Sequence, residues 1–249
     1  MTFRHLLLFA CALALVSSVA WLAQRRPATG DPVLSSAGPP SLVAQPAPGP
    51  APSPAARIAS SSAPSADARW VRRTAVVAGI PEEAVAAYAR AVLAAPHTCG
   101  LGWTTLAGIG WVESQHGTIG GRSLDAAGRP STPILGPALD GVGPVAAIRA
   151  TASSSALHGD AAWDHAVGPM QFLPSTWETW GRDGDGDGTA DPQDLDDAAA
   201  AAAAYLCGTG QDLATGAGWS AAVYAYNHSA SYVSGVYLAA TTYADRAAG

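Results

Sequence analysis

The sequence contains no lysine and few charged residues of any kind. All 13 of its basic residues are arginines, charged residues make up 13% of the 249 positions, and the formal net charge is -6 at pH 7. A protein that binds nucleic acid needs a concentrated basic surface, which this composition does not offer. We therefore expect no nucleic acid as a partner. We attribute the lack of lysine, together with the abundance of alanine, to genomic base bias.

Cysteine is also scarce, with three residues in the chain. Cys11 lies in an apolar N-terminal segment, which leaves Cys99 and Cys207 as an even pair in the rest of the sequence. In an oxidising compartment such a pair favours a disulfide over a catalytic thiol. The bond would close a loop of roughly 100 residues and would stabilise the fold by about 4 kcal/mol in the chain-entropy description.

The N-terminal segment, residues 1–26, predicts export. Arg4 precedes an apolar run from Leu6 to Ala23, within which Ser18-Val19-Ala20 resembles the small-residue cleavage site of a signal peptide. The run is also long enough to cross a bilayer as an uncleaved membrane anchor, and Arg25-Arg26 after it favour that alternative. In both cases the rest of the chain is exported.

Residues 27–67 predict a disordered linker. Proline, alanine, serine and glycine dominate this stretch, and it shows no apolar periodicity. The linker is followed by one domain, residues 68–249, which shows helical periodicity and no alternating strands of any length. We therefore expect a mainly α fold, and we expect the domain to be a monomer.

The start and stop residues of this domain predict several helices. Pro81 followed by Glu82 and Glu83 indicates a helix start, and Pro96 limits that helix at its other end. Further helices are expected at 101–116, in the short TWETW segment with Ser175 as its cap, at 194–207, at 219–227 and at 230–245. The Gly- and Pro-rich residues 118–167 are expected to form an irregular functional loop.

Glutamate is limited to four residues, and one of them lies at the end of an apolar helix. In the predicted helix 101–116, the spacing places Glu113 on one face with Leu106 and Gly110. Burial beside apolar neighbours and the negative end of the helix dipole would both raise the pKa of Glu113, as a general acid requires. Gly110 would leave open space for a substrate. The alternative is a helix-end carboxylate that points to water.

Two motifs for a catalytic metal are incomplete. Glu113-x-x-His116 matches half of a di-iron helix motif, but the sequence has no second copy. The zinc-protease pattern His-Glu-x-x-His does not occur either. We therefore expect no cofactor for catalysis.

Acidic residues are concentrated in residues 181–197, which hold seven of the nineteen. Their spacing fits the twelve-residue loop of an EF-hand-like calcium site, with Gly188 at the sixth position. The predicted ligands are Asp183, Asp185, Asp187, the backbone carbonyl of Thr189, Asp191 and Asp194. Asp194 stands where glutamate is usual, so its shorter side chain is expected to weaken the site. We predict a structural Ca2+ or another cation in the 183–194 loop. A solvated acidic turn is the alternative.

Three ordered segments are similar to one protein family. They are WVESQHG at 111–117, AVGPMQFLPSTW at 166–177 followed by the acidic loop and an alanine-rich helix, and AYNHSASYVSGV at 225–236. Over about residues 70–245, their order and spacing resemble the lytic murein transglycosylases of the MltB-like class. The resemblance implies a lysozyme-like helical domain that acts on peptidoglycan glycan strands. A calcium-type loop and a cysteine near each end of the core are also family features.

The resemblance assigns candidate roles to single residues. Glu113, paired with Ser114, matches the catalytic acid/base of the family. The positions that match the sugar cleft are Met170, Gln171, Tyr226, Asn227 and Tyr232. Amide side chains suit sugar hydroxyls and N-acetyl groups on their own terms, because each amide both donates and accepts hydrogen bonds. Packing in the core stays an alternative for the two tyrosines and the methionine.

The expected reaction follows from the resemblance together with the shortage of carboxylates. Most glycoside hydrolases use two carboxylates, but no second glutamate lies at a family position here. One acid suffices if the sugar supplies the nucleophile. The MurNAc-β-1,4-GlcNAc bond would then be cleaved with formation of a 1,6-anhydromuramyl end, as in lytic transglycosylation. The alternatives are a hydrolytic muramidase on the same fold and a non-catalytic cell-wall-binding protein.

Overall fold

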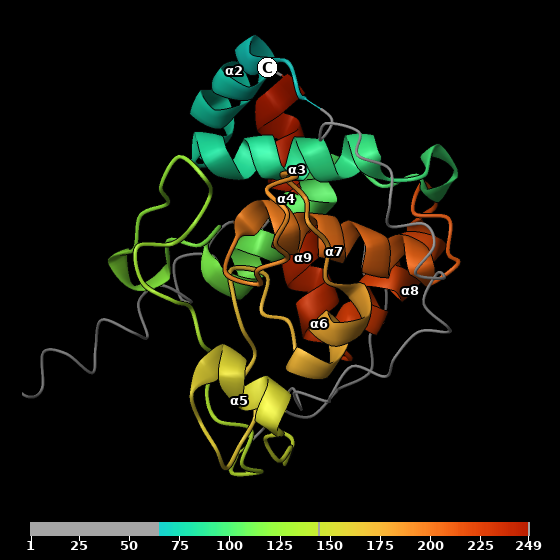
Figure 1. The fold of residues 1–249 in the computed structure, drawn as a ribbon. Helices are drawn as coiled ribbons and strands as arrows, with labels where there is room; N and C mark the ends of the chain where they lie inside the picture. The colour runs from blue at the N-terminus through green and yellow to red at the C-terminus, as the bar shows by residue number, and fades with distance from the viewer. Residues whose placement is uncertain (1–64, 144, 249) are drawn as a thin grey trace, which may run out of the picture. The chain divides into compact units, whose positions relative to one another are not determined.

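The described part of the chain is built from α-helices, which confirms the predicted mainly α class (Figure 1). The computed structural model describes residues 65–143 and 145–248. Extended segments in these residues form isolated bridges and no sheet. The eight α-helices of the described residues are α2 (Ala68–Ala78), α3 (Glu82–Ala94), α4 (Trp103–Ser114), α5 (Ala152–His158), α6 (Pro174–Trp180), α7 (Leu195–Gly208), α8 (Gly216–Tyr226) and α9 (Ala230–Ala248).

Four helices form the centre of the fold, with α4 packed mainly on α9 and α3 on α7. Small residues allow these close pairings. The buried face of α7 consists largely of alanines, whose short side chains let the neighbouring helix approach. At the crossing of α4 and α9, a Cβ atom on Gly108 would lie 2.8 Å from the carbonyl oxygen of Val236. Glycine is therefore required there, and α4 lies directly against the backbone of α9.

Two cross-links hold α7 in place. The predicted disulfide joins Cys99, at the end of the short 3-10 helix η3 (His97–Cys99), to Cys207 in the last turn of α7. Near the other end of α7, Arg90 of α3 donates two hydrogen bonds of 2.6 Å to the buried carboxylate of Asp196. A bidentate pair of this kind fixes orientation as well as distance. Helix α7 is therefore linked to neighbouring segments near both of its ends.

The helices predicted from start and stop signals are present, although some of their ends differ. The helix expected after Pro81 is α3, and its first turn carries both glutamates. The helix expected to stop at Gly117 ends earlier, because Gln115 and His116 take left-handed φ angles of 53° and 61°. The prediction of Ser175 as a helix cap is wrong: α6 begins at Pro174, and its N-terminus has no side-chain cap.

Two helices were not predicted. Helix α2 begins after an Asp67 cap and ends before Gly79. Both are common helix-boundary residues, and they lie at the edge of a Pro- and Ser-rich stretch. Helix α5 lies inside the region 118–167, which we expected to be irregular throughout. Its start is fixed by a capping box in which Thr151 and Ser154 exchange hydrogen bonds.

The predicted export segment, residues 1–26, lies outside the described residues. Residues 27–64 of the predicted linker lie outside them as well. Within the described ranges, the helices lack the combination of length and apolar character that a membrane span requires. The choice between signal peptide and anchor therefore stays a prediction.

Removing the disulfide is expected to destabilise the fold. The bridge links residues 108 positions apart, so opening it frees a long loop in the unfolded chain and lowers the free energy of unfolding by about 4 kcal/mol. Urea denaturation of the Cys99→Ser/Cys207→Ser variant measures this loss. The Cys11→Ser variant is the control, and an unchanged midpoint in the double variant contradicts the prediction.

Candidate active site

Glu113 lies in the last turn of α4, where its carboxylate meets a tyrosine of α9. The hydroxyl of Tyr232 donates a hydrogen bond of 2.6 Å to Glu113 Oε1. Tyr232 itself is buried, whereas Glu113 keeps partial exposure. The carboxylate is therefore held by the fold through Tyr232, so the alternative of a free helix-end carboxylate in water does not describe it.

Burial raises the pKa of Glu113 to about 7, and the hydrogen bond from Tyr232 acts against this rise. Desolvation disfavours the charged carboxylate, whereas a donated hydrogen bond favours it. The first of the two causes expected from the sequence is thus present. A carboxyl group with a pKa near neutrality can release and accept a proton in turn at neutral pH.

Ser114 connects the end of α4 to a second segment of the site. Its hydroxyl donates a hydrogen bond of 2.6 Å to the carbonyl oxygen of Pro169 and accepts one of 2.8 Å from the N–H of Gly117. Because the side chain is fully buried, both contacts are shielded from water. Ser114 therefore fixes the position of the turn that carries Met170, and its contacts are with the protein backbone.

Tyr226 brings the end of α8 to the same place. Its hydroxyl donates a hydrogen bond of 2.9 Å to the carbonyl oxygen of Met170, and its ring stacks on that of Tyr232 with a centroid distance of 6.4 Å. Tyr226 and Met170 are almost completely buried. The burial of both side chains agrees with the alternative of core packing, and their contact joins the end of α8 to the turn at Met170.

Gln171 has a strained backbone beside this cluster. Its φ is 50°, and its side-chain amide donates a hydrogen bond of 2.9 Å to the carbonyl oxygen of Gly168. Non-glycine residues with positive φ are uncommon and are often found at functional sites. A Cβ atom on Gly136 would come within 2.8 Å of Gln171 Oε1, so glycine at that position leaves room for the amide.

Asn227 directly follows α8 and has a polar atom without a partner. Its Oδ1 atom is buried and accepts no hydrogen bond from the residues that the structure describes. A buried carbonyl oxygen in this state costs free energy unless another molecule satisfies it. Asn227 therefore carries an unsatisfied acceptor directly after Tyr226.

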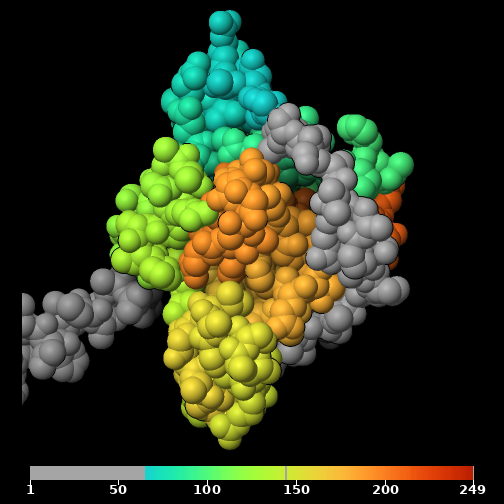
Figure 2. All heavy atoms as spheres, viewed as in Figure 1, coloured from blue at the N-terminus to red at the C-terminus, as the bar shows by residue number. Residues whose placement is uncertain are grey.

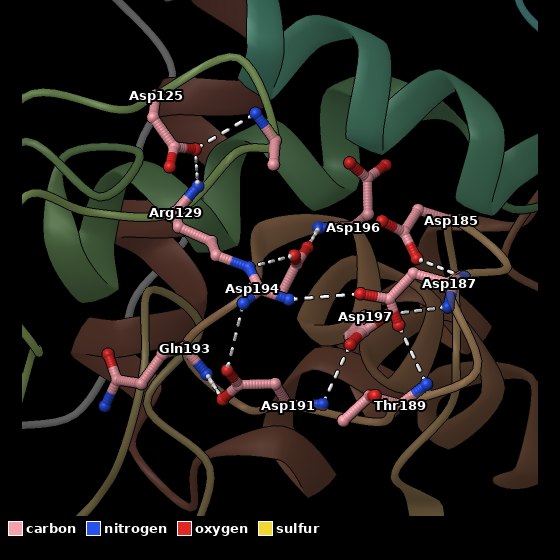
Figure 3. A network of polar contacts seen from close by, with 12 residues as sticks. Asp125, Arg129, Asp185, Asp187, Thr189, Asp191, Gln193, Asp194, Asp196 and Asp197 are labelled. Atoms are coloured by element: carbon pink, nitrogen blue, oxygen red, sulfur yellow. Dashed lines mark hydrogen bonds and ion pairs between the residues drawn. The ribbon is translucent and has the colours of Figure 1, made fainter.

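The acidic loop brings three of the predicted metal ligands together, and two of them, Asp185 and Asp187, are labelled in Figure 3. Carboxylate oxygens of Asp183, Asp185 and Asp187 lie within 4.8 Å of one another. Gly188, at the predicted sixth position, has a φ of 92°, a conformation that favours glycine. Hard oxygen donors gathered in this way suit a cation such as Ca2+, so this group could hold a metal ion.

Two further predicted ligands, Asp191 and Asp194, lie against Arg129, which also donates a hydrogen bond of 3.3 Å to Asp187 of the group. Arg129 Nε donates a hydrogen bond of 2.9 Å to Asp194 Oδ2, and its Nη1 lies 3.9 Å from Asp191 Oδ2 (Figure 3). The other oxygen of Asp194 accepts a hydrogen bond of 2.9 Å from the N–H of Asp196 and so caps α7. The loop spacing predicts that Asp191 and Asp194 share one site with the three aspartates. The structure does not group them with those three.

The acidic loop supports the turn that Ser114 and Tyr226 contact. A Cβ atom on Gly168 would lie only 1.7 Å from the carbonyl oxygen of Pro192, so the two backbones touch. The side-chain amide of Gln193 exchanges two hydrogen bonds with the backbone of Ile134, which in turn accepts one from the N–H of Gly168. In the space-filling view, residues of this part of the chain, in orange, form the surface between α2 and α5 (Figure 2).

Sequence reasoning missed two residues that organise the site. Arg129 stands in a Gly- and Pro-rich region, and nothing in its spacing relates it to the loop 58 residues later that it contacts. His116 had no assigned role, yet both of its ring nitrogens are hydrogen-bonded in the core. The space expected beside Gly110 is also filled, because a Cβ atom there would lie 2.0 Å from the hydroxyl of Tyr88. That glycine makes room for a tyrosine, and the expectation of open space for a substrate is wrong.

Comparison with known proteins agrees with this picture. A family model described as "Transglycosylase SLT domain" matches residues 146–224, which include Met170, Gln171 and the acidic loop. Glu113 lies before the matched stretch, and Asn227 and Tyr232 lie after it. No curated protein and no solved structure matches the chain.

Such a domain implies lytic transglycosylase activity on peptidoglycan, with glycan strands as the bound partner. Together with the disulfide, it indicates a location outside the cytoplasm. Residues 146–224 of the chain therefore match the transglycosylase SLT domain of the MltB-type lytic transglycosylase family.

Proposed function

We propose that the protein cleaves the MurNAc-β-1,4-GlcNAc bond of peptidoglycan and leaves a 1,6-anhydromuramyl end, with Glu113 as the single acid/base. The observation that carries this proposal is the buried carboxyl group of Glu113, a partly exposed residue, held by Tyr232 at the end of α4; burial raises its pKa to about 7. The hydrogen bond that holds it comes from the hydroxyl of Tyr232 and not from a second acid.

In the first step, protonated Glu113 donates its proton to the glycosidic oxygen, and the bond from C1 of the muramyl sugar to that oxygen breaks. The N-acetyl oxygen of the same sugar stabilises the positive charge at C1. Burial of Glu113 keeps its proton available near neutral pH, which is the condition for a general acid. The hydroxyl of Tyr232 stabilises the carboxylate that is left behind.

In the second step, ionised Glu113 accepts the proton of the C6 hydroxyl of the muramyl sugar while O6 bonds to C1. The carboxyl group is thereby restored, and no water is taken up. A hydrolase that follows the two-carboxylate scheme needs a second acid to activate water or to attack C1. The remaining described glutamates are at the start of α3 and on α6, where Glu178 accepts a hydrogen bond from Ser153.

The residues that we propose to bind the glycan strand lie on segments linked to Glu113 and have different tasks. Asn227 offers its partnerless Oδ1 atom to an N–H group, for example that of an N-acetyl substituent. Gln171 presents a side-chain amide from a turn in a left-handed conformation. We place Ser114, Met170, Tyr226 and Tyr232 in the same binding region because their contacts fix the segments on which Glu113, Gln171 and Asn227 lie.

For the whole chain we propose three parts: an export segment at 1–26, a linker at 27–67, and a lysozyme-like transglycosylase domain at 68–249. The last part contains all eight described α-helices. We propose that it acts as a monomer in the cell envelope, either secreted or anchored by the N-terminal segment.

We further propose that the 183–194 loop is EF-hand-like and binds a structural Ca2+. The donors are the three grouped aspartates, and the backbone carbonyl of Thr189 is a further candidate. Asp191 and Asp194 would complete the site only if they exchanged their contacts with Arg129 for the ion. The ion would offset the repulsion of closely spaced carboxylates. Its proposed task is to stabilise the loop behind Gly168.

The Glu113→Gln variant is expected to lose wall digestion by roughly 10²- to 10⁴-fold, because the amide keeps the shape but cannot transfer a proton. Turbidity loss of purified peptidoglycan measures the rate. Glu178→Gln is the matched control, since it removes another carboxylate of the chain. Mass spectrometry of the wild-type products tests the reaction type. Anhydro ends are lighter by one water than hydrolysed ends, and finding only hydrolysed ends would identify a muramidase instead.

The rate is expected to fall as the pH rises through about 7, because the acid form of Glu113 is then lost. In the Tyr232→Phe variant this fall should move to higher pH by about 1 unit, since the hydrogen bond that favours the carboxylate is missing. The pH profile of kcat/KM measures both effects. A fall at the same pH in both proteins contradicts the assignment of Tyr232 as the group that lowers the pKa.

Chelation is expected to lower the melting temperature before it affects the chemistry. If the free ion is present at 100 times its Kd, its removal lowers the free energy of unfolding by about 2.7 kcal/mol. This loss corresponds to a fall in melting temperature of roughly 5–10 °C for a domain of this size. Differential scanning calorimetry with and without chelator measures the shift, and added Ca2+ should reverse it. Asp185→Asn should abolish the response, whereas Asp245→Asn on α9 should retain it. An unchanged wild-type melting temperature refutes the structural role of the ion.

A further inference from the structure

A chain of three side chains, Tyr88, His116 and Tyr243, crosses the core behind Glu113. His116 Nδ1 lies 3.0 Å from the hydroxyl of Tyr88 on α3, and its Nε2 lies 2.8 Å from the hydroxyl of Tyr243 on α9. The imidazole is 2% exposed, and both tyrosines are buried. His116, two residues after the end of α4, is thereby hydrogen-bonded to two other helices at once.

The three hydrogen-bonded side chains carry no charge. Burial lowers the pKa of His116 to about 3 and raises that of Tyr243 to about 12, and burial likewise raises the pKa of Tyr88. A neutral imidazole has one N–H donor and one bare acceptor nitrogen. One tyrosine hydroxyl therefore donates to the ring, and the other accepts from it. Both ring nitrogens are satisfied without a charge in the core, and the tautomer of the ring sets which tyrosine donates and which accepts.

The backbone around His116 is bent to make these contacts. Gln115, His116 and Gly117 take consecutive φ angles of 53°, 61° and 86°, and two of these residues carry side chains. The N–H of His116 returns to the carbonyl oxygen of Gly110 at 2.8 Å. Strain of this kind persists only where the surrounding contacts enforce it, and it is common at functional sites. Here the contacts to Tyr88 and Tyr243 supply that enforcement.

Helix α9 consequently contacts the end of α4 at two points. Tyr232 and Tyr243 are eleven residues apart, which is close to three helical turns and places both on one face of α9. Tyr232 contacts Glu113, and Tyr243 contacts His116. Loss of the second contact would let the end of α4 shift locally against α9, and such a shift would change the position of Glu113 against Tyr232.

We propose that His116 is a positioning residue for Glu113, and that the Tyr88–His116–Tyr243 chain holds the carboxyl group in its buried place beneath Tyr232. The inference rests on the proposed function only in taking Glu113 as the acting acid. The titratable groups that face Glu113 are Tyr232 and Tyr226, and neither is part of the Tyr88–His116–Tyr243 series. A change at His116 or Tyr243 therefore reaches Glu113 through position alone.

The test is the titration of Glu113 in the full chain, followed by carbon NMR of side-chain carboxyls. The protein has four glutamates, so labelling them gives four signals, and Glu113→Gln identifies the one sought. The pKa should fall by at least about 0.5 unit in Tyr243→Phe and in His116→Asn, because burial is the larger of the two effects on Glu113. Tyr237→Phe, on an exposed part of α9, is the matched control and should leave it unchanged.

Kinetics give a second readout. In Tyr243→Phe, kcat should fall on the order of ten-fold with little change in KM, since a misplaced acid affects the chemical step more than sugar binding. His116→Asn keeps an amide at the Nδ1 position for Tyr88. Its effects should therefore match those of Tyr243→Phe, and the double variant should be no worse than either single one.

Two outcomes would overturn the inference. In the first, Tyr243→Phe and His116→Asn lower the melting temperature while the Glu113 titration and kcat stay as in the wild type, which is the result of a purely structural role. In the second, the effects of the two substitutions add. Failure of the proposed function is recognised separately, because it would appear as unchanged digestion by Glu113→Gln, whereas the titration reads the position of the carboxyl group whatever the reaction.

Discussion

The hydrogen bond between Tyr232 and Glu113 is the contact on which the rest of the site depends. A carboxyl group must lose water for its pKa to rise, yet it must stay reachable for a substrate. The end of α4 meets both conditions because it leaves the core beside a buried tyrosine. Gly108 makes this possible, since a larger residue would hold α4 away from α9. The close crossing of two helices thus sets the protonation chemistry of one side chain.

Around this contact the fold places two supports of different physical kinds. Behind α4, the neutral chain through His116 fixes the helix end with hydrogen bonds alone. Behind the turn at Gly168, the acidic loop uses charge, with Arg129 set against its aspartates. The charged support lies with the loop, and Glu113 has an uncharged tyrosine as its bonding partner. A cation placed directly beside Glu113 would lower its pKa and remove the proton that the proposed reaction needs.

Much of the fold and part of the site could be predicted from local sequence. Helix α3 is marked by Pro81 and two acids, and the raised pKa of Glu113 follows from its place at the end of an apolar run. What could not be predicted depends on residues far apart in the chain. Gly110 was interpreted as space, but the hydroxyl of Tyr88 fills it. The spacing of the acidic loop gave Asp194 to a metal, whereas the structure gives it to Arg129, 65 residues earlier.

Two opposing effects on the pKa of Glu113 explain why one acid can be enough in the role we propose for it. The group must first give a proton and then take one, so neither protonation state can be strongly preferred. Burial favours the neutral acid, and the hydroxyl of Tyr232 favours the carboxylate. Their opposition leaves the pKa at about 7, where both forms are accessible. A second carboxylate nearby would shift this balance by repulsion, so the proposed reaction, in which the nucleophile is a neutral sugar hydroxyl, leaves the balance at Glu113 undisturbed.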